Sequence, residues 1–184
     1  MILIIVLLVT CQYIQCLSLN NEYKAVDELD LDKYVGRWYE VYGNRFDKTF
    51  QGNGKCVQAF YESNGFNVSV LNTQLDKNNN LDSITGFAYY KDGDDGGYLT
   101  VQLDDLPEAP YWVIELGPIY DGMYDYSIVS DNVQLSLFVL TRNVSRFYKE
   151  YDETVLVSLE DFGFNKFYNE PIEIEQDCIE SIHL

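Results

Sequence analysis

The sequence has few of the residues on which most catalytic and metal sites depend. Its only histidine is His183, next to the C-terminal residue. Neither a Ser-His-Asp triad nor a His-rich metal site can therefore be assembled, and we predict no catalytic residue, no metal and no cofactor. The acidic segment 92–97 lacks the later carboxylates and the terminal Glu of an EF-hand loop. We interpret it as the tip of a hairpin rather than as a calcium site.

Basic residues are scarce as well. The chain has 12 Lys and Arg against 30 Asp and Glu, which gives a formal net charge of -18 at pH 7. Nucleic acids and anionic membranes are bound through clusters of Lys and Arg, and the sequence has no such cluster. Both are therefore excluded as partners, and the acidity mainly favours solubility.

Long apolar runs are absent apart from one at the N-terminus. Residues 2–9 are all apolar, a run shorter than the roughly 20 residues that a transmembrane helix needs. Mostly polar or small residues follow from 10 to 18, which is the order found in a signal peptide. A lipoprotein cleavage box fits poorly, because Thr10 precedes Cys11 and no basic residue precedes the run. We predict that residues 1–17 are a removed signal peptide, that residues 18–184 form one domain, and that the mature protein is secreted without a transmembrane segment.

The remaining sequence consists largely of short runs rich in Tyr, Phe, Val and Ile. Turn signals such as Asn64-Gly65 and Asp131-Asn132 separate them, which is typical of an antiparallel meander. Eight strands in a meander close naturally into a barrel with room inside for one small ligand. The predicted strands span residues 37–45, 56–62, 66–74, 82–90, 98–103, 111–116, 124–130 and 134–142.

One helix is predicted, from Val144 to about residue 162. Apolar residues recur there every four positions, so that they share one face that can pack against the barrel wall; they are Phe147, Tyr151, Val155 and Leu159. Gly163 is placed to end the helix, and residues 172–174 are expected to add a short last strand.

Four segments carry motifs in a fixed order along the chain. They are residues 29–39, which contain Gly36-Arg37-Trp38, and residues 109–114, 124–130 and 137–142. Together they resemble the lipocalins of the apolipoprotein D and bacterial lipocalin type, over roughly residues 27 to 178. The resemblance implies an all-β fold: an eight-stranded antiparallel up-and-down β-barrel (the lipocalin calyx) with one C-terminal α-helix packed on it. The segment 117–123 departs from the family pattern.

Two cysteines, Cys56 and Cys178, remain after removal of the predicted signal peptide. Two cysteines in a secreted chain most simply form one disulfide, and the resemblance implies a bridge between the second strand and the C-terminal tail at these two positions. Asn67 and Asn143 begin Asn-x-Ser patterns, so both are possible N-glycosylation sites.

Trp38 fixes which side chains face the barrel interior, because successive side chains on a strand point to opposite faces. By resemblance it lies at the closed base, with the guanidinium of Arg142 stacked on it as a structural pair. Glu40 is the polar residue of greatest interest, since a buried carboxylate could donate to a ligand or could bond only to neighbouring tyrosines. Stepping by two along each strand predicts the ligand-lining set: Glu40, Tyr42, Val57, Ala59, Tyr61, Val68, Val70, Tyr111, Val113, Tyr126, Phe138 and Leu140.

These residues predict a binding protein rather than an enzyme. The lining is mostly apolar with several hydroxyls, as expected of a site for a small hydrophobic ligand such as a fatty acid, lysolipid, sterol or retinoid-like molecule. The alternative is a recognition protein that binds a cell-surface receptor through aromatic-rich loops at the barrel mouth, where Phe50, Tyr120 and Met123 are available. An isomerase with Cys56 as nucleophile is a lesser alternative, because it requires the disulfide to be absent.

Overall fold

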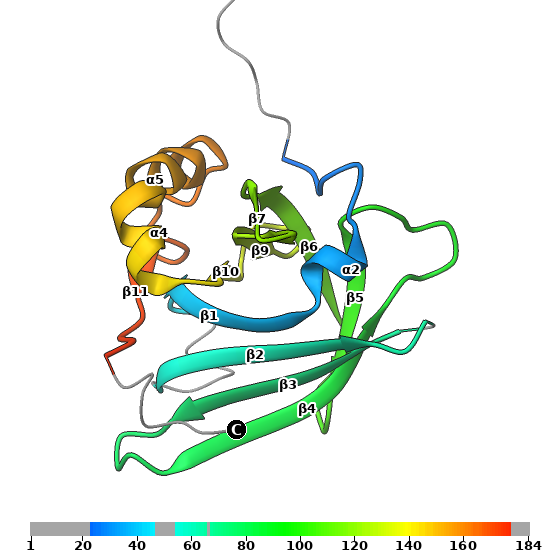
Figure 1. The fold of residues 1–184 in the computed structure, drawn as a ribbon, viewed down its shortest axis with the longest axis horizontal. Helices are drawn as coiled ribbons and strands as arrows, with labels where there is room; N and C mark the ends of the chain where they lie inside the picture. Colours follow the sequence, from blue (N-terminus) through cyan, green and yellow to red (C-terminus); the bar gives the residue numbers. More distant parts are fainter. Residues whose placement is uncertain (1–22, 47–53, 66, 178–184) are drawn as a thin grey trace, which may run out of the picture.

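Eight antiparallel strands form a closed barrel in the computed structural model, which describes residues 23–46, 54–65 and 67–177 (Figure 1). Each strand pairs with its neighbour along the sheet, and the last barrel strand pairs with the first, which closes the barrel. The predicted fold class is confirmed. In order, the barrel strands are β1 (Gly36–Gly43), β2 (Lys55–Ser63), β3 (Val68–Leu75), β4 (Leu81–Tyr89), β5 (Tyr98–Leu103), β6 (Ala109–Leu116), β9 (Tyr126–Ser130) and β10 (Leu137–Thr141).

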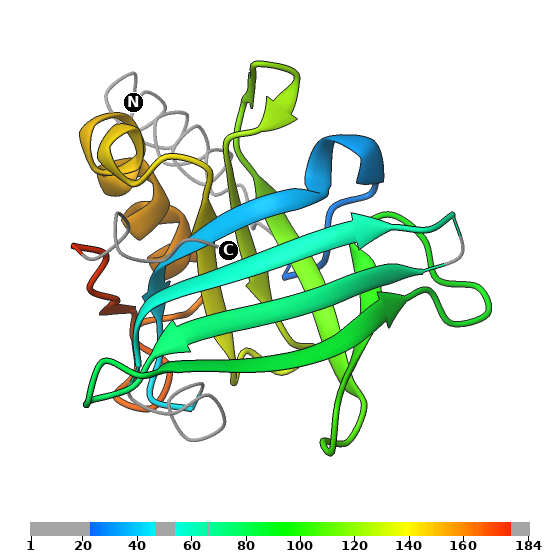
Figure 2. The same cartoon turned by 60° about the horizontal axis from the view of Figure 1, so that its bottom comes forward.

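A short helix, α2 (Leu31–Tyr34), leads into β1 at one end of the barrel. The Asp30 side chain caps it by accepting the N–H of Asp32 at 3.1 Å. Beside it lies a small hairpin that the sequence did not predict, made of β7 (Ile119–Tyr120) and β8 (Met123–Tyr124) (Figure 2). The turn residues Asp121 and Gly122 have φ values of 48° and 82°, as a tight two-residue hairpin turn requires.

The predicted C-terminal helix is present but is broken into two. Helix α4 (Val144–Glu150) and helix α5 (Asp152–Asp161) meet at Tyr151, whose φ of -121° and ψ of -23° lie outside helical geometry. Gly163 follows with φ of +88°, so its predicted role at the helix end fits. Strand β11 (Ile172–Glu173) then pairs with β1. Within the described residues, no helix is long and apolar enough to cross a membrane.

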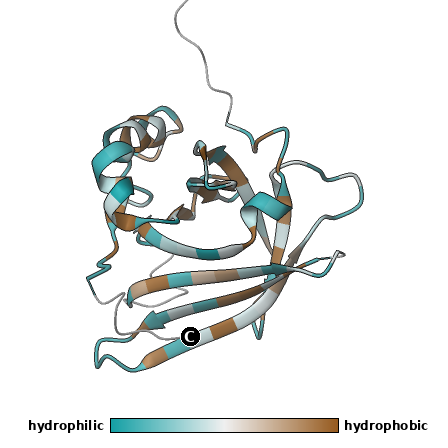
Figure 3. Ribbon diagram, viewed as in Figure 1, coloured by the Kyte–Doolittle hydropathy of each residue, from teal (hydrophilic) through white to brown (hydrophobic). Residues whose placement is uncertain are grey.

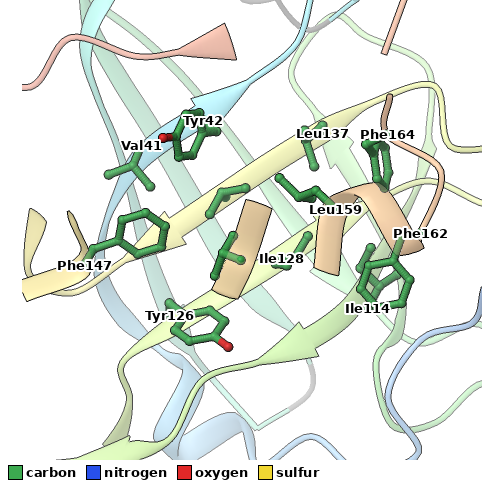
Figure 4. Close-up of a cluster of buried hydrophobic side chains, with 12 residues drawn as sticks. Val41, Tyr42, Ile114, Tyr126, Ile128, Leu137, Phe147, Leu159, Phe162 and Phe164 are labelled. Carbon is green, nitrogen blue, oxygen red and sulfur yellow. The ribbon is translucent and has the colours of Figure 1, made fainter. Parts of the chain in front are cut away.

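Apolar side chains gather in two clusters on opposite faces of the barrel wall, and apolar and polar residues mix along its strands (Figure 3). One cluster lines the interior. The other lies between the wall and the helices, where Phe147, Val155 and Leu159 meet the outward side chains of β1, β6, β9 and β10 (Figure 4). The helix face predicted from the four-residue repeat is therefore the one that packs on the barrel.

Candidate ligand-binding site

The base of the barrel is plugged by Trp38 and Arg142. The Arg142 guanidinium lies 3.6 Å from the centroid of the Trp38 ring, and the indole is fully buried. Trp38 Nε1 donates to the carbonyl of Tyr34 at 2.8 Å, which ties β1 to helix α2. Burial lowers the pKa of Arg142 to about 10, so the guanidinium stays protonated at neutral pH. The structure therefore places this pair as the resemblance implied.

Eight of the twelve predicted lining residues belong to the interior cluster or pack against it. Their side chains come from β2, β3, β6 and β10, so they converge on one space from several sides of the wall. The buried members are Ala59, Tyr61, Val68, Val70, Val113 and Leu140, and Tyr111 and Phe138 pack against them.

Glu40 and Val57 are buried where β1 and β2 separate. Glu40 is 5% exposed and pairs with Leu140, so it faces inward like Trp38. Val57 belongs to neither apolar cluster. Gln176 bridges the gap, because its Nε2 donates to the carbonyls of Glu40 at 2.7 Å and of Val57 at 2.9 Å. The tail after β11 thus satisfies backbone acceptors that the strand pair leaves open.

Tyr42 does not line the interior, contrary to the prediction. The pairing of β1 with β10 shifts between Glu40 and Tyr42, because Glu40 pairs with Leu140 but Tyr42 pairs with Val139. Such a bulge changes the face of every later side chain. Tyr42 therefore packs against Phe147 of helix α4 and donates from its hydroxyl to Asp152 at 2.7 Å.

Tyr126 is also wrongly predicted to face inward. It pairs with Thr141, whereas its neighbour Ser127 pairs with the inward-facing Leu140. Directly opposed residues share a face, so Ser127 points into the barrel and Tyr126 points out. Its hydroxyl donates to Glu115 at 2.8 Å. The sequence just before β9 departs from the family pattern. The predicted alternation of inward and outward side chains on this strand was therefore out of register by one residue.

A chain of hydroxyl groups crosses the interior above the base. The Tyr34 hydroxyl lies 2.9 Å from that of Tyr111 and 3.2 Å from Ser127 Oγ. Tyr111 in turn donates to the Tyr61 hydroxyl at 3.1 Å. Burial raises the pKa of Tyr34 to about 12 and raises those of Tyr61 and Tyr111 further above the usual value. All three phenols are therefore neutral at physiological pH.

Tyr120 and Met123, which were expected at the barrel mouth, are not found there. Tyr120 and Met123 belong to the β7–β8 hairpin, which lies beside helix α2 at the base. The Tyr124 hydroxyl accepts the N–H of Asp30 at 3.3 Å, which confirms this placement. Phe50 lies outside the described residues. The placement of Tyr120 and Met123 therefore does not support receptor binding at the mouth.

A separate cavity of about 440 Å³ lies on the rim opposite the base. It is lined by charged residues of β2, of the β3–β4 turn, of β11 and of the tail, among them Lys55, Asp76 and Glu173. Such a lining is unlike that of a site for an apolar molecule. The interior, with its apolar walls and hydroxyl chain, remains the candidate site.

Comparison with known proteins agrees with this geometry. A family model described as a lipocalin-like domain matches residues 29–168, more than half of the chain. The chain belongs to the lipocalin family. Membership supports binding of a small hydrophobic ligand.

Relatives of this lipocalin include animal and bacterial proteins. Apolipoprotein D of Rattus norvegicus is 36% identical over 91 residues, which cover 48% of this chain and 46% of that protein; the match thus spans about half the length of this relative. The outer membrane lipoprotein Blc of Vibrio cholerae is 32% identical over 129 residues, 69% of this chain and 72% of that protein. Insecticyanin from Manduca sexta shares the fold, with a TM-score of 0.61, 17% identity and coverage of 84% of each chain.

The interior of this lipocalin also contains residues that sequence reasoning missed. They are Tyr34 from helix α2, Ala88 and Leu99 from β4 and β5, and Ser127 and Val129 from β9. Tyr34 is the last residue of α2 and lies four positions before Trp38, within the motif segment 29–39, so a signal for it was present in the motif. Ser127 and Val129 follow from the corrected phase of β9.

Proposed function

We propose that this lipocalin is a secreted carrier that holds one small hydrophobic ligand inside its barrel. The interior cluster carries this proposal: apolar side chains from most of the barrel strands surround a few hydroxyl groups above a plugged base. Apolar walls with few polar groups are typical of small-molecule sites. Fatty acids, lysolipids, sterols and retinoid-like molecules are the candidate classes.

The expected affinity is modest. Burying about 300 Å² of apolar ligand surface at roughly 25 cal/mol per Å² contributes about 7.5 kcal/mol before the costs of binding. That corresponds to dissociation constants of micromolar order or weaker. Tolerance among hydrophobic ligands is therefore expected.

Filling the interior should abolish binding. Ala59 lies directly across from Trp38 on β2 and is buried, so Ala59→Trp places an indole in the proposed site. We expect at least a tenfold loss of affinity for N-phenyl-1-naphthylamine, an uncharged apolar fluorophore, in a fluorescence titration. Phe60→Trp on the opposite face of the same strand is the matched control. Equal binding by both variants would contradict the proposal.

We also propose that Cys56 and Cys178 form the disulfide of a secreted chain. Cys56 is buried and its N–H donates to the carbonyl of Glu175 at 2.8 Å, which brings the tail to within three residues of Cys178. Cys178 itself and the proposed signal peptide lie outside the described residues. Of the two proposed glycosylation sites, Asn67 follows the β2–β3 turn and Asn143 caps helix α4.

The disulfide has a direct test. Labelling of the unreduced, denatured, secreted protein with a thiol reagent should find no free thiol, and Cys56→Ser/Cys178→Ser should lose about 2 to 4 kcal/mol of unfolding free energy. One reactive thiol at Cys56 would contradict the bridge and would favour the isomerase alternative. Urea unfolding with and without reductant provides the second measurement.

A further inference from the structure

The hydroxyl chain of the interior has a direction. Each phenol and each serine hydroxyl has one proton to donate. Because Tyr111 donates to Tyr61, its oxygen must receive the proton of Tyr34 across their 2.9 Å contact. Tyr34 in turn must receive the proton of Ser127. The chain therefore runs from Ser127 to Tyr61.

One donor remains at the end of this chain. The proton of Tyr61 has no acceptor among the described residues, although the residue is only 6% exposed. Buried donors in native proteins are almost always satisfied, and an unsatisfied one is costly. The ring of Tyr61 stacks on the ring of Tyr34, with 6.0 Å between the ring centroids, and meets the ring of Tyr111 edge-on, with 6.3 Å between the centroids. These contacts fix the position of the Tyr61 hydroxyl.

The interior around this donor already contains a carboxylate. Glu40 is buried and shares the inward face of β1 with Trp38. Burial is the main cause of the raised pKa of Tyr61, and the charge of Glu40 adds to it. A second negative charge in this poorly screened space would be repelled, so a carboxylate head group is disfavoured here.

We propose that the Tyr61 hydroxyl anchors the ligand by donating to an uncharged oxygen, such as that of an ester, ketone or aldehyde on an apolar skeleton. This inference rests on the proposed carrier function and narrows its ligand class. It disfavours free fatty acids, whose carboxylate would approach Glu40. The apolar walls hold the skeleton, and the hydroxyl chain fixes the end that carries the oxygen.

Three ligands with the same hydrocarbon chain test the proposal: methyl oleate, oleic acid and cis-9-octadecene. Their affinities are measured at pH 8 by displacement of N-phenyl-1-naphthylamine. Tyr61→Phe/Tyr111→Phe keeps both rings and removes the terminal donor, because Tyr34 can then donate to Ser127. Tyr126→Phe is the matched control, since it removes a phenol hydroxyl from the outer face of the barrel and leaves the Tyr61 proton free.

In the wild type, methyl oleate should bind more tightly than oleic acid. The ratio of methyl oleate affinity to cis-9-octadecene affinity should fall about three- to tenfold in the double variant and stay unchanged in Tyr126→Phe. An unchanged ratio in the double variant, or tighter binding of oleic acid, would overturn the anchor while the carrier function stands. Absence of binding by the fluorophore and all three ligands would overturn the carrier function itself.

Discussion

Replacing Arg142 with alanine should lower the free energy of unfolding by about 3 to 5 kcal/mol. The guanidinium donates to the carbonyls of Arg37 at 2.5 Å and of Tyr34 and Val35 at 2.8 Å. Alanine would leave these part-buried acceptors without the donor and would expose the ring of Trp38. Urea denaturation followed by tryptophan fluorescence measures the loss.

Two further variants separate the possible causes of this loss. Arg142→Lys keeps the charge but cannot reach three carbonyls with one ammonium group, so it should recover less than half of the stability. Arg37→Ala removes a guanidinium 4.6 Å from the Phe60 ring, on the outer face of the barrel, and should cost about 1 kcal/mol or less. Equal stability of Arg142→Ala and Arg37→Ala would show that the Trp38–Arg142 pair adds no more to the free energy of unfolding than a cation on an aromatic ring at the outer face of the barrel.

The sequence was sufficient to predict the barrel because several separate signals in it agree. Short runs rich in apolar and aromatic residues, turn residues between them and the Trp38 motif all favour the same closed meander. The placement of Arg142 over Trp38 came from the resemblance rather than from the alternation. The helix face followed from Phe147, Val155 and Leu159, which are all buried.

The prediction of side-chain direction failed where the strand pairing is irregular. The shift between Glu40 and Tyr42 in β1 turns Tyr42 outward, and a similar shift between Val113 and Glu115 interrupts β6. A bulge depends on how two distant strands fit together, so no pattern within one strand reveals it. A tyrosine such as Tyr42 suits the barrel interior as well as the interface between the barrel wall and the helices. Its neighbours in the sequence do not show which of the two places it occupies.

The β7–β8 hairpin was not predicted for a different reason. Residues 117–123 lie where the family pattern is lost, and the turn at Asp121-Gly122 forms a hairpin of only two residues per strand. Its position at the base is fixed by tertiary contacts, since Arg146 of helix α4 lies 3.7 Å from the centroid of the Tyr120 ring. Such contacts join segments distant in sequence, and without them Tyr120 was assigned to the mouth.

The same arginine forms a buried ion pair that should be costly to break. Asp125 has a side chain only 2% exposed, and Arg146 donates to its two oxygens at 2.6 and 2.5 Å. Arg146→Ala would leave the carboxylate buried without its partner, so we expect a loss of about 3 to 5 kcal/mol in urea unfolding. Lys149→Ala, on the exposed face of the same helix, should change stability by about 0.5 kcal/mol or less.

A double-mutant cycle distinguishes an unpaired charge from lost packing. Asp125→Ala/Arg146→Ala removes both charges, so it should be less destabilised than the sum of the two single variants by about 2 kcal/mol or more. If the losses of unfolding free energy in the two single variants simply add, each side chain stabilises the protein through its own contacts. For Arg146 this contact would be the one with the ring of Tyr120. In that case Tyr120→Ala should lose as much stability as Arg146→Ala, whereas the ion-pair account expects a much smaller loss because Asp125 keeps its partner.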